Sequence, residues 1–192
     1  TYLKWFAYWL KDEKNAIIDM PKVQYYMMGA NEWRSSEVWP PQSTRLEKFY
    51  LHSNGHANSR QGDGALMQAM PNNEPADQYT YDPAMPVPSC GGLMCCTGTK
   101  EFVAGSFDQS DIEMRNDILV YTTPTLKEAV EVGGPIEVEL YVTSSAKDTD
   151  FVAKLIDVYP DGRAFNIQEG TLRARYLEGF DKKVFMEESG IR

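Results

Sequence analysis

Residues 135–144, PIEVELYVTS, alternate between apolar side chains and polar or aromatic ones. Ile136, Val138, Leu140 and Val142 share one face, and this period of two predicts a half-buried antiparallel strand. Further strand-like segments, bounded by turn residues, are expected at residues 23–29, 47–52, 78–82, 117–123, 151–159 and 170–176. Short strands without alternating helices predict a mainly β fold, either a β-sandwich or a jelly roll.

A turn and three long connections complete this pattern. Pro160, Asp161 and Gly162 predict a turn after residues 151–159, because proline presets φ and glycine accepts a positive φ. Long polar connections span residues 31–45, 53–75 and 82–107. Long ordered loops are often functional, so these connections are where we expect function to lie.

Residues 1–14 predict a helix with an unusually apolar surface. At the helical spacing of i, i+3, i+4 and i+7, one face carries Leu3, Phe6, Ala7 and Leu10. Other faces carry Trp5, Tyr8 and Trp9. A helix that is apolar nearly all round needs burial on several sides. We therefore expect it to belong to, or pack against, a domain outside this sequence; the alternative is a lid across the β domain.

The charge and the lengths of the apolar runs argue against nucleic-acid and membrane partners. The net charge of -9 argues against nucleic acid, which requires a concentrated basic patch. No apolar run approaches the roughly 20 residues that span a bilayer, so no membrane partner is expected. The chain opens without a signal peptide, which indicates the interior of a longer protein and assigns no cellular location.

No catalytic or metal-binding set emerges from the motifs, and no cofactor is predicted. A G-x-S-x-G elbow is absent, and the two histidines, His52 and His56, are expected to be surface or turn residues. The three cysteines have neither a zinc-site spacing nor the even count of a disulfide framework. Turn-capping is the expected role of Asp148, Asp150, Asp157 and Asp161.

Five stretches in order carry a resemblance to a known family. They are VQYYMMGANEWRSSEVWPP, FYLHSNGHANS, YDPAMPVPSCGG, FDQSDIEMRNDILVYTT and YVTSSAKDTDFVAKLIDVYPDGRA. Together they resemble the C-terminal region of X-prolyl dipeptidyl-peptidase and cocaine-esterase type serine hydrolases, a group that includes α-amino-acid ester hydrolases and glutaryl acylases. The resemblance runs from about Leu3 to Tyr176.

The resemblance implies a fragment of a larger enzyme. The family combines an α/β-hydrolase domain, a helical cap and a C-terminal jelly roll of the galactose-binding-like type. Residues 1–43 would then be the end of the hydrolase domain with its linker, and residues 44–192 a jelly roll truncated at its C-terminus. The family's Ser, Asp and His precede the segment matching Val23, so no catalytic residue is carried over and the fragment alone is expected to be inactive.

The resemblance also implies partners and one candidate site. The partners are the missing hydrolase and cap domains, a small ester, amide or peptide substrate, and a second copy in a homo-oligomer. Four residues after the PVPSCGG stretch could line a substrate pocket across the domain interface: Leu93, Met94, Cys95 and Cys96. The alternative is that this segment is only a structural interface loop.

Two other functions remain open from the sequence. A free-standing carbohydrate- or ligand-binding jelly-roll module could use four aromatic rings as stacking faces: Trp33, Trp39, Tyr50 and Tyr79. A pure interaction domain in a larger assembly is the third alternative.

Overall fold

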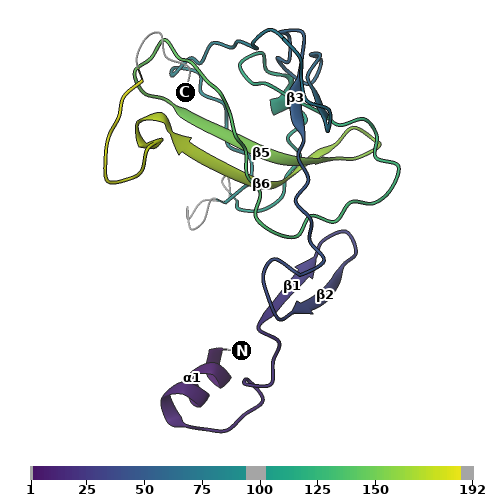
Figure 1. The fold of residues 1–192 in the computed structure, drawn as a ribbon, viewed down its shortest axis with the longest axis vertical. Helices are drawn as coiled ribbons and strands as arrows, with labels where there is room; N and C mark the ends of the chain where they lie inside the picture. The colour runs from purple at the N-terminus through teal and green to yellow at the C-terminus, as the bar shows by residue number, and fades with distance from the viewer. Residues whose placement is uncertain (1, 94–102, 187–192) are drawn as a thin grey trace. The chain divides into compact units, whose positions relative to one another are not determined.

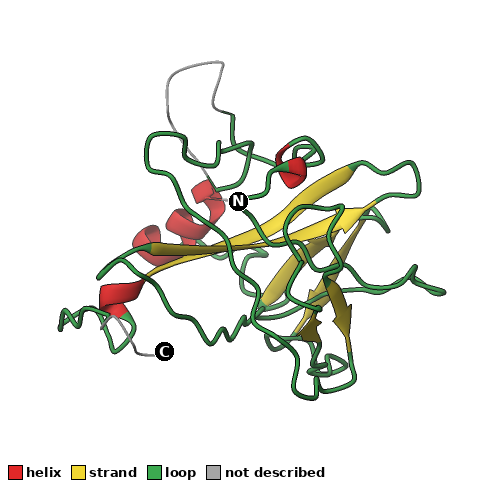
Figure 2. Cartoon of the chain, turned by 90° about the horizontal axis from the view of Figure 1, so that it is seen from above, coloured by secondary structure: helices red, strands yellow, loops and turns green. Residues whose placement is uncertain are grey.

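The computed structural model describes residues 2–93 and 103–186, and β-strands dominate its regular structure (Figure 1). Figure 2 shows that long loops connect most of the strands. The chain divides into two compact units, one of residues 1–47 with 126–137 and the other of residues 48–125 with 138–192. In the described ranges, no helix has the length and apolar character needed to cross a membrane.

The first unit contains a helix and a β-hairpin. Helix α1 spans Tyr2–Lys11 and buries none of its residues. Strands β1 (Val23–Met27) and β2 (Glu32–Ser36) pair antiparallel, from Val23 opposite Ser36 to Met27 opposite Glu32. Residues 126–137 also belong to this unit, and Glu131 among them forms a two-pronged ion pair with Arg34 of β2, at 2.6 and 2.8 Å.

The second unit contains two further antiparallel pairs. The long strands β5 (Asp150–Val158) and β6 (Ala164–Arg173) lie side by side in Figure 1. The short strands β3 (Tyr50–His52) and β4 (Ala65–Met67) pair with each other. The described part of this unit also contains two single-turn 3₁₀ helices, η1 at Ile112–Met114 and η2 at Ala174–Tyr176.

Several sequence predictions are confirmed. The strands expected at residues 23–29 and 151–159 are β1 and β5, and the segment at 47–52 contains β3. The predicted turn at Pro160 to Gly162 joins β5 to β6, with Gly162 at φ 89° and its N–H bonded to the carbonyl oxygen of Tyr159 at 2.9 Å. The helix expected at residues 1–14 is present but ends at Lys11.

The strand predicted at residues 135–144 is wrong. This segment forms no strand, and Ile136, Val138 and Leu140 are 45%, 54% and 38% exposed. Alternation specifies which side chains would share a face, but a strand also requires a partner edge for its backbone hydrogen bonds. None of the described residues supplies that edge for this segment.

Three further segments differ from the predicted strands. Residues 78–82 are not a strand, and residues 117–123 contribute only isolated bridges, at Leu119 to Asn58 and at Thr122 to Ala65. The strand expected at 170–176 starts earlier, at Ala164, and gives way to η2 after Arg173. Strands β2 and β4 lie inside stretches expected to be polar connections, because pairing across a hairpin does not require apolar alternation.

Gly64 lies so close to residues 120–122 that adding one methyl group there should lower the stability of the protein. A Cβ at Gly64 would collide with the carbonyl oxygen of Val120 and approach the Cβ of Ala57 to 2.9 Å. Gly64→Ala should therefore destabilise the protein by about 1–3 kcal/mol through forced backbone shifts, measured as a lower midpoint of chemical unfolding. Gly170→Ala is the matched control, because nothing lies within 4 Å of its added Cβ. Equal midpoints for the two variants would contradict this packing.

Candidate functional site

The candidate pocket segment begins at a narrow loop neck, which we define as residues 90–93 and 103–108. Gly92 and Gly105 close it by exchanging two backbone hydrogen bonds of 2.8 and 3.0 Å. Of the predicted pocket residues, Leu93 lies directly beyond this pair and is 68% exposed. Met94, Cys95 and Cys96 lie outside the described residues. The structure therefore places one of the four predicted residues, at the mouth of the neck.

Two consecutive glycines are required at the neck. Gly91 and Gly92 have φ values of 66° and 85°, a region that favours glycine. A Cβ on Gly91 would collide with the carbonyl oxygen of Gly105 and lie 2.6 Å from the ring of Phe107. A Cβ on Gly92 would collide with the carboxylate of Glu169. The Gly-Gly pair in PVPSCGG thus allows a close approach of backbone and carboxylate.

Two buried amide side chains hold the backbone of the neck. Gln109, only 2% exposed, donates from Nε2 to the carbonyl oxygens of Cys90 and Phe107, at 2.8 and 3.0 Å. Asn166 on β6 accepts from the N–H of Phe107 at 2.7 Å and donates to the carbonyl oxygen of Gly105 at 3.3 Å. Lys154 on β5 donates to Oε1 of Gln109 at 3.0 Å. Buried backbone groups need such partners, so the amide pair fixes both arms of the neck.

Asp108 anchors the neck to β6 as an ionised group. Its Oδ1 accepts from the N–H of Ala164 at 2.9 Å and from the N–H of Ser110 at 3.0 Å. These backbone hydrogen bonds, that of Ala164 first, hold the pKa of the carboxyl below its ordinary value. Cys90 is a free, half-buried thiol whose Sγ lies 3.8 Å from the carbonyl oxygen of Asp108. The described part of the neck thus positions backbone and offers no paired nucleophile and base.

The sequence did not reveal the residues that build the neck. Gln109, Asn166 and Glu169 come from segments far from residues 90–93, and no motif links them. The only local signal was the adjacent glycines, whose close contacts were not anticipated. Side chains that satisfy backbone groups of a distant loop have no fixed spacing, so a single sequence does not identify them.

A second polar network surrounds His52, which was expected to be a surface or turn residue. Instead His52 lies on β3, and its side chain is 13% exposed. Its Nδ1 lies 2.7 Å from the Glu74 carboxylate and its Nε2 lies 2.7 Å from the carbonyl oxygen of Ala69. A carbonyl and an ionised carboxylate only accept hydrogen bonds, so both ring nitrogens carry a proton. His52 is thus an imidazolium clamp on the segment from Ala69 to Glu74.

The pKa values of the clamp agree with this assignment. The hydrogen bond to Ala69 and then that to Glu74 raise the pKa of His52 above 6.5. The hydrogen bonds from His52 and from the N–H of Ser53 lower the pKa of Glu74. These hydrogen bonds favour the protonated ring of His52 over the neutral imidazole that a general base requires.

Asp77 organises the neighbouring loop. Its carboxylate accepts hydrogen bonds from Ser53 Oγ at 2.6 Å, from the Tyr121 hydroxyl at 2.7 Å and from the N–H of Ala57 at 2.8 Å. Burial opposes ionisation of Asp77, but these three donors outweigh it and lower its pKa. Burial and the adjacent Asp77 raise the pKa of Tyr121. Ser53 therefore donates its hydroxyl hydrogen to a structural carboxylate.

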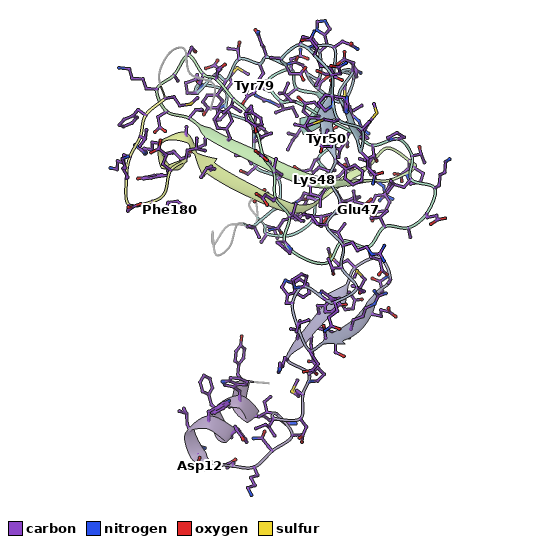
Figure 3. The ribbon with its side chains drawn as sticks, in the orientation of Figure 1. Asp12, Glu47, Lys48, Tyr50, Tyr79 and Phe180 are labelled. Atoms are coloured by element: carbon purple, nitrogen blue, oxygen red, sulfur yellow. The ribbon has the colours of Figure 1, made fainter. Side chains whose placement is uncertain are left out.

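The four aromatic residues of the alternative stacking site do not form one platform. Trp33 packs on Tyr26 and Trp39 packs on Tyr25, each with ring centroids 5.5 Å apart. Tyr25 and Tyr26 are adjacent on β1 and point to opposite faces of the hairpin, so the two tryptophans also lie on opposite faces. Tyr50 lies on β3 and Tyr79 on a loop of the other unit (Figure 3).

Comparisons with known proteins agree on one family. Residues 15–188 match the model of the X-Pro dipeptidyl-peptidase C-terminal non-catalytic domain. The chain is 42% identical over 182 residues to cocaine esterase from Rhodococcus sp. (strain MB1 Bresler), covering 95% of this chain and 31% of that protein. The crystal structure of an aminopeptidase from the marine sediment archaeon Thaumarchaeota archaeon superposes with a TM-score of 0.76 at 27% identity, covering 100% of this chain and 32% of that one. The chain thus spans about a third of the length of these relatives.

The clamp predicts that the pKa of His52 lies above its ordinary value of 6.5, because Ala69 and Glu74 accept hydrogen bonds from the ring. A raised folded pKa gives stability that is complete below pH 6.5 and is lost as the pH rises through the folded pKa. NMR titration of the His52 ring protons should show this elevation, and Glu74→Gln should reduce it by removing a charged acceptor. Glu137→Gln, at an exposed position, is the control. A His52 pKa at or below 6.5 in the unsubstituted protein would contradict the doubly protonated ring.

Proposed function

Because the chain belongs to the family of X-Pro dipeptidyl-peptidase C-terminal non-catalytic domains, we propose that it is the non-catalytic β-sandwich domain of a serine hydrolase. In this proposal it packs on the catalytic domain and helps to shape the substrate pocket. The parent enzyme transfers the acyl group of a small ester, amide or peptide to water through a serine nucleophile, a histidine base and an oxyanion hole. The names of two relatives, an esterase and an aminopeptidase, support a hydrolase as the parent enzyme.

The proposed organisation divides the chain near residue 43. Residues 1–43 would be the end of an α/β-hydrolase domain with its linker, and residues 44–192 a jelly roll. The dominance of β-strands over helices supports the second assignment, as does the TM-score of 0.76 to a solved relative. The missing hydrolase and cap domains, and a second copy in a homo-oligomer, would be the partners.

Helix α1 is the observation that carries the proposal. It has ten residues, and isolated helices of fewer than about 12–15 residues are marginal in water. Yet six large apolar side chains of α1 are exposed: Tyr2, Leu3, Trp5, Phe6, Trp9 and Leu10. A patch of this kind marks an interaction site. Packing against the catalytic domain would bury these side chains and stabilise the helix.

Leu93 supports the pocket part of the proposal. It is a large apolar side chain that remains exposed although the backbone on both sides of the neck is held by hydrogen bonds. In this proposal Leu93, with Met94, Cys95 and Cys96, lines the acyl pocket of the parent enzyme. Soft side chains such as Met and Cys suit a pocket that accepts varied acyl groups.

The first test compares the chain with the parent enzyme on p-nitrophenyl acetate. We expect saturable turnover from the complete protein and none from residues 1–192 alone, because the serine, the histidine base and the oxyanion hole would lie outside this chain. Saturable turnover by the chain alone would contradict a non-catalytic role. Binding of the chain to a glycan array without effect on the esterase would instead favour a carbohydrate-binding module.

The second test addresses the docking of α1. In the complete protein Phe6→Ala should reduce the free energy of unfolding by about 3 kcal/mol, the cost of truncating a buried phenylalanine. Lys4→Ala, on the same helix, is the control, since it removes no apolar side chain. Chemical unfolding of the complete protein measures both. If Phe6→Ala costs no more than Lys4→Ala, α1 does not dock through this face.

A further inference from the structure

We propose that Glu169 is a positioning residue for the substrate pocket, because its carboxylate holds the backbone at Gly92 and Leu93 and so directs Leu93 into the pocket. This inference rests on the proposed function of Leu93. Glu169 lies on β6, 76 residues away from Leu93 in sequence. It makes no contact with substrate in this proposal and acts only through the backbone that it holds.

A β-bulge brings Glu169 to the correct face of the sheet. Lys154 pairs with Glu169 and Ile156 pairs with Asn166, so residues two apart on β5 oppose residues three apart on β6. The extra residue, Ile167, reverses the alternation, because a bulge sets two residues of one strand against one of its partner. Asn166 and Glu169 therefore share the face that meets the neck. In a regular strand, residues three apart would point to opposite faces.

The carboxylate of Glu169 contacts the backbone of Gly92 and Leu93 in two ways. Its Oε1 accepts from the N–H of Leu93 at 3.0 Å, a charge-assisted hydrogen bond. It also lies over Gly92, where an added Cβ would come within 2.6 Å of Cδ and 2.7 Å of Oε2. The positive φ of Gly92, 85°, turns the chain so that the N–H of Leu93 meets this oxygen. Glycine and carboxylate thus fix the direction in which the chain leaves the neck.

The other side chains that hold the neck do not contact the backbone at Leu93, which Glu169 holds. Gln109 and Asn166 hold Cys90, Phe107 and Gly105, so their hydrogen bonds go to the Gly92–Gly105 pair or to residues on its near side, and none goes to Leu93. The cation opposite Glu169 is Lys154, and its Nζ donates to Gln109 at 3.0 Å. Loss of the Glu169 carboxylate therefore leaves the neck closed and frees only the backbone at Leu93. We expect a change in substrate binding with little change in folding.

The test uses the complete enzyme with p-nitrophenyl esters of increasing acyl length. Glu169→Ala should raise KM by about tenfold for the longer esters with little change in kcat, the loss expected for a hydrogen bond to a charged group. Glu169→Gln should raise KM less, because its amide oxygen still accepts from Leu93. Gln168→Ala, on the same strand at an exposed position of the other face, should leave KM unchanged. Amide hydrogen exchange at Leu93 should be faster in Glu169→Ala than in Gln168→Ala.

A further variant, Leu93→Asp, distinguishes the pocket role of Leu93 from the positioning role of Glu169. If Leu93→Asp raises KM and Glu169→Ala does not, the proposed pocket role stands and the positioning role of Glu169 is overturned. If neither variant changes KM, the pocket role itself fails, and the inference fails with it. A fall in thermal stability and in kcat of Glu169→Ala, at unchanged KM, would show that Glu169 is only structural.

Discussion

The buried amides of Gln109 and Asn166 satisfy the backbone on both sides of the loop neck, and the arrangement of the neck depends on them. They are 2% and 4% exposed, and Gln109 is the largest fully buried side chain in the described part of the chain. An unpaired buried peptide group costs about 1–3 kcal/mol, so several such groups would open the neck. With the amides in place, residues 90 and 107 are held and the Gly92–Gly105 pair can form. Polar contacts, rather than an apolar core, therefore determine where Leu93 leaves the domain.

Polar contacts also hold other loops of the second unit. Two of its most buried apolar residues, Ala57 and Ala164, are small, and both are 0% exposed. Small side chains allow loops to approach closely, but they bury little apolar area and so contribute little hydrophobic free energy. The connection that begins at Ser53 is instead held by Asp77, which accepts from Ser53 and Ala57, and by Glu74, which accepts from the N–H of Ser53. Charged and amide side chains thus anchor these loops.

The predictions that succeeded depend on local pattern. β1, β5 and the turn at Gly162 follow from apolar runs and from turn chemistry within a few residues. The strand predicted at 135–144 failed although its alternation is the strictest in the chain, because a strand needs a partner edge that no local pattern encodes. The bulge at Ile167 was invisible for a related reason, since it appears only in the register against β5. Glu169 was consequently missed as a contact of the Gly-Gly pair.

The resemblance to the family supplied what local pattern did not. It pointed to Leu93, whose exposure and position at the neck now give that expectation a structural context. It did not indicate how the segment is held, since Glu169 and Gln109 lie in different parts of the chain. The resemblance indicated the segment, whereas the geometry identifies the groups that bond to its backbone.

Several carboxylates of the chain serve as acceptors for backbone N–H groups. Asp77, Asp108, Glu169 and Asp63 accept from the N–H groups of Ala57, Ala164, Leu93 and Asn54. Each of these carboxylates satisfies a backbone donor without a cation beside it in that bond, and the chain as a whole carries a net charge of -9. Hydrogen bonds lower the pKa of Asp77 and Asp108 below 3.8, so their stabilisation is present above that pH and is lost as the pH falls through the folded values. His52 loses its stabilisation in the opposite direction, as the pH rises, and the loops are therefore anchored best between these two limits.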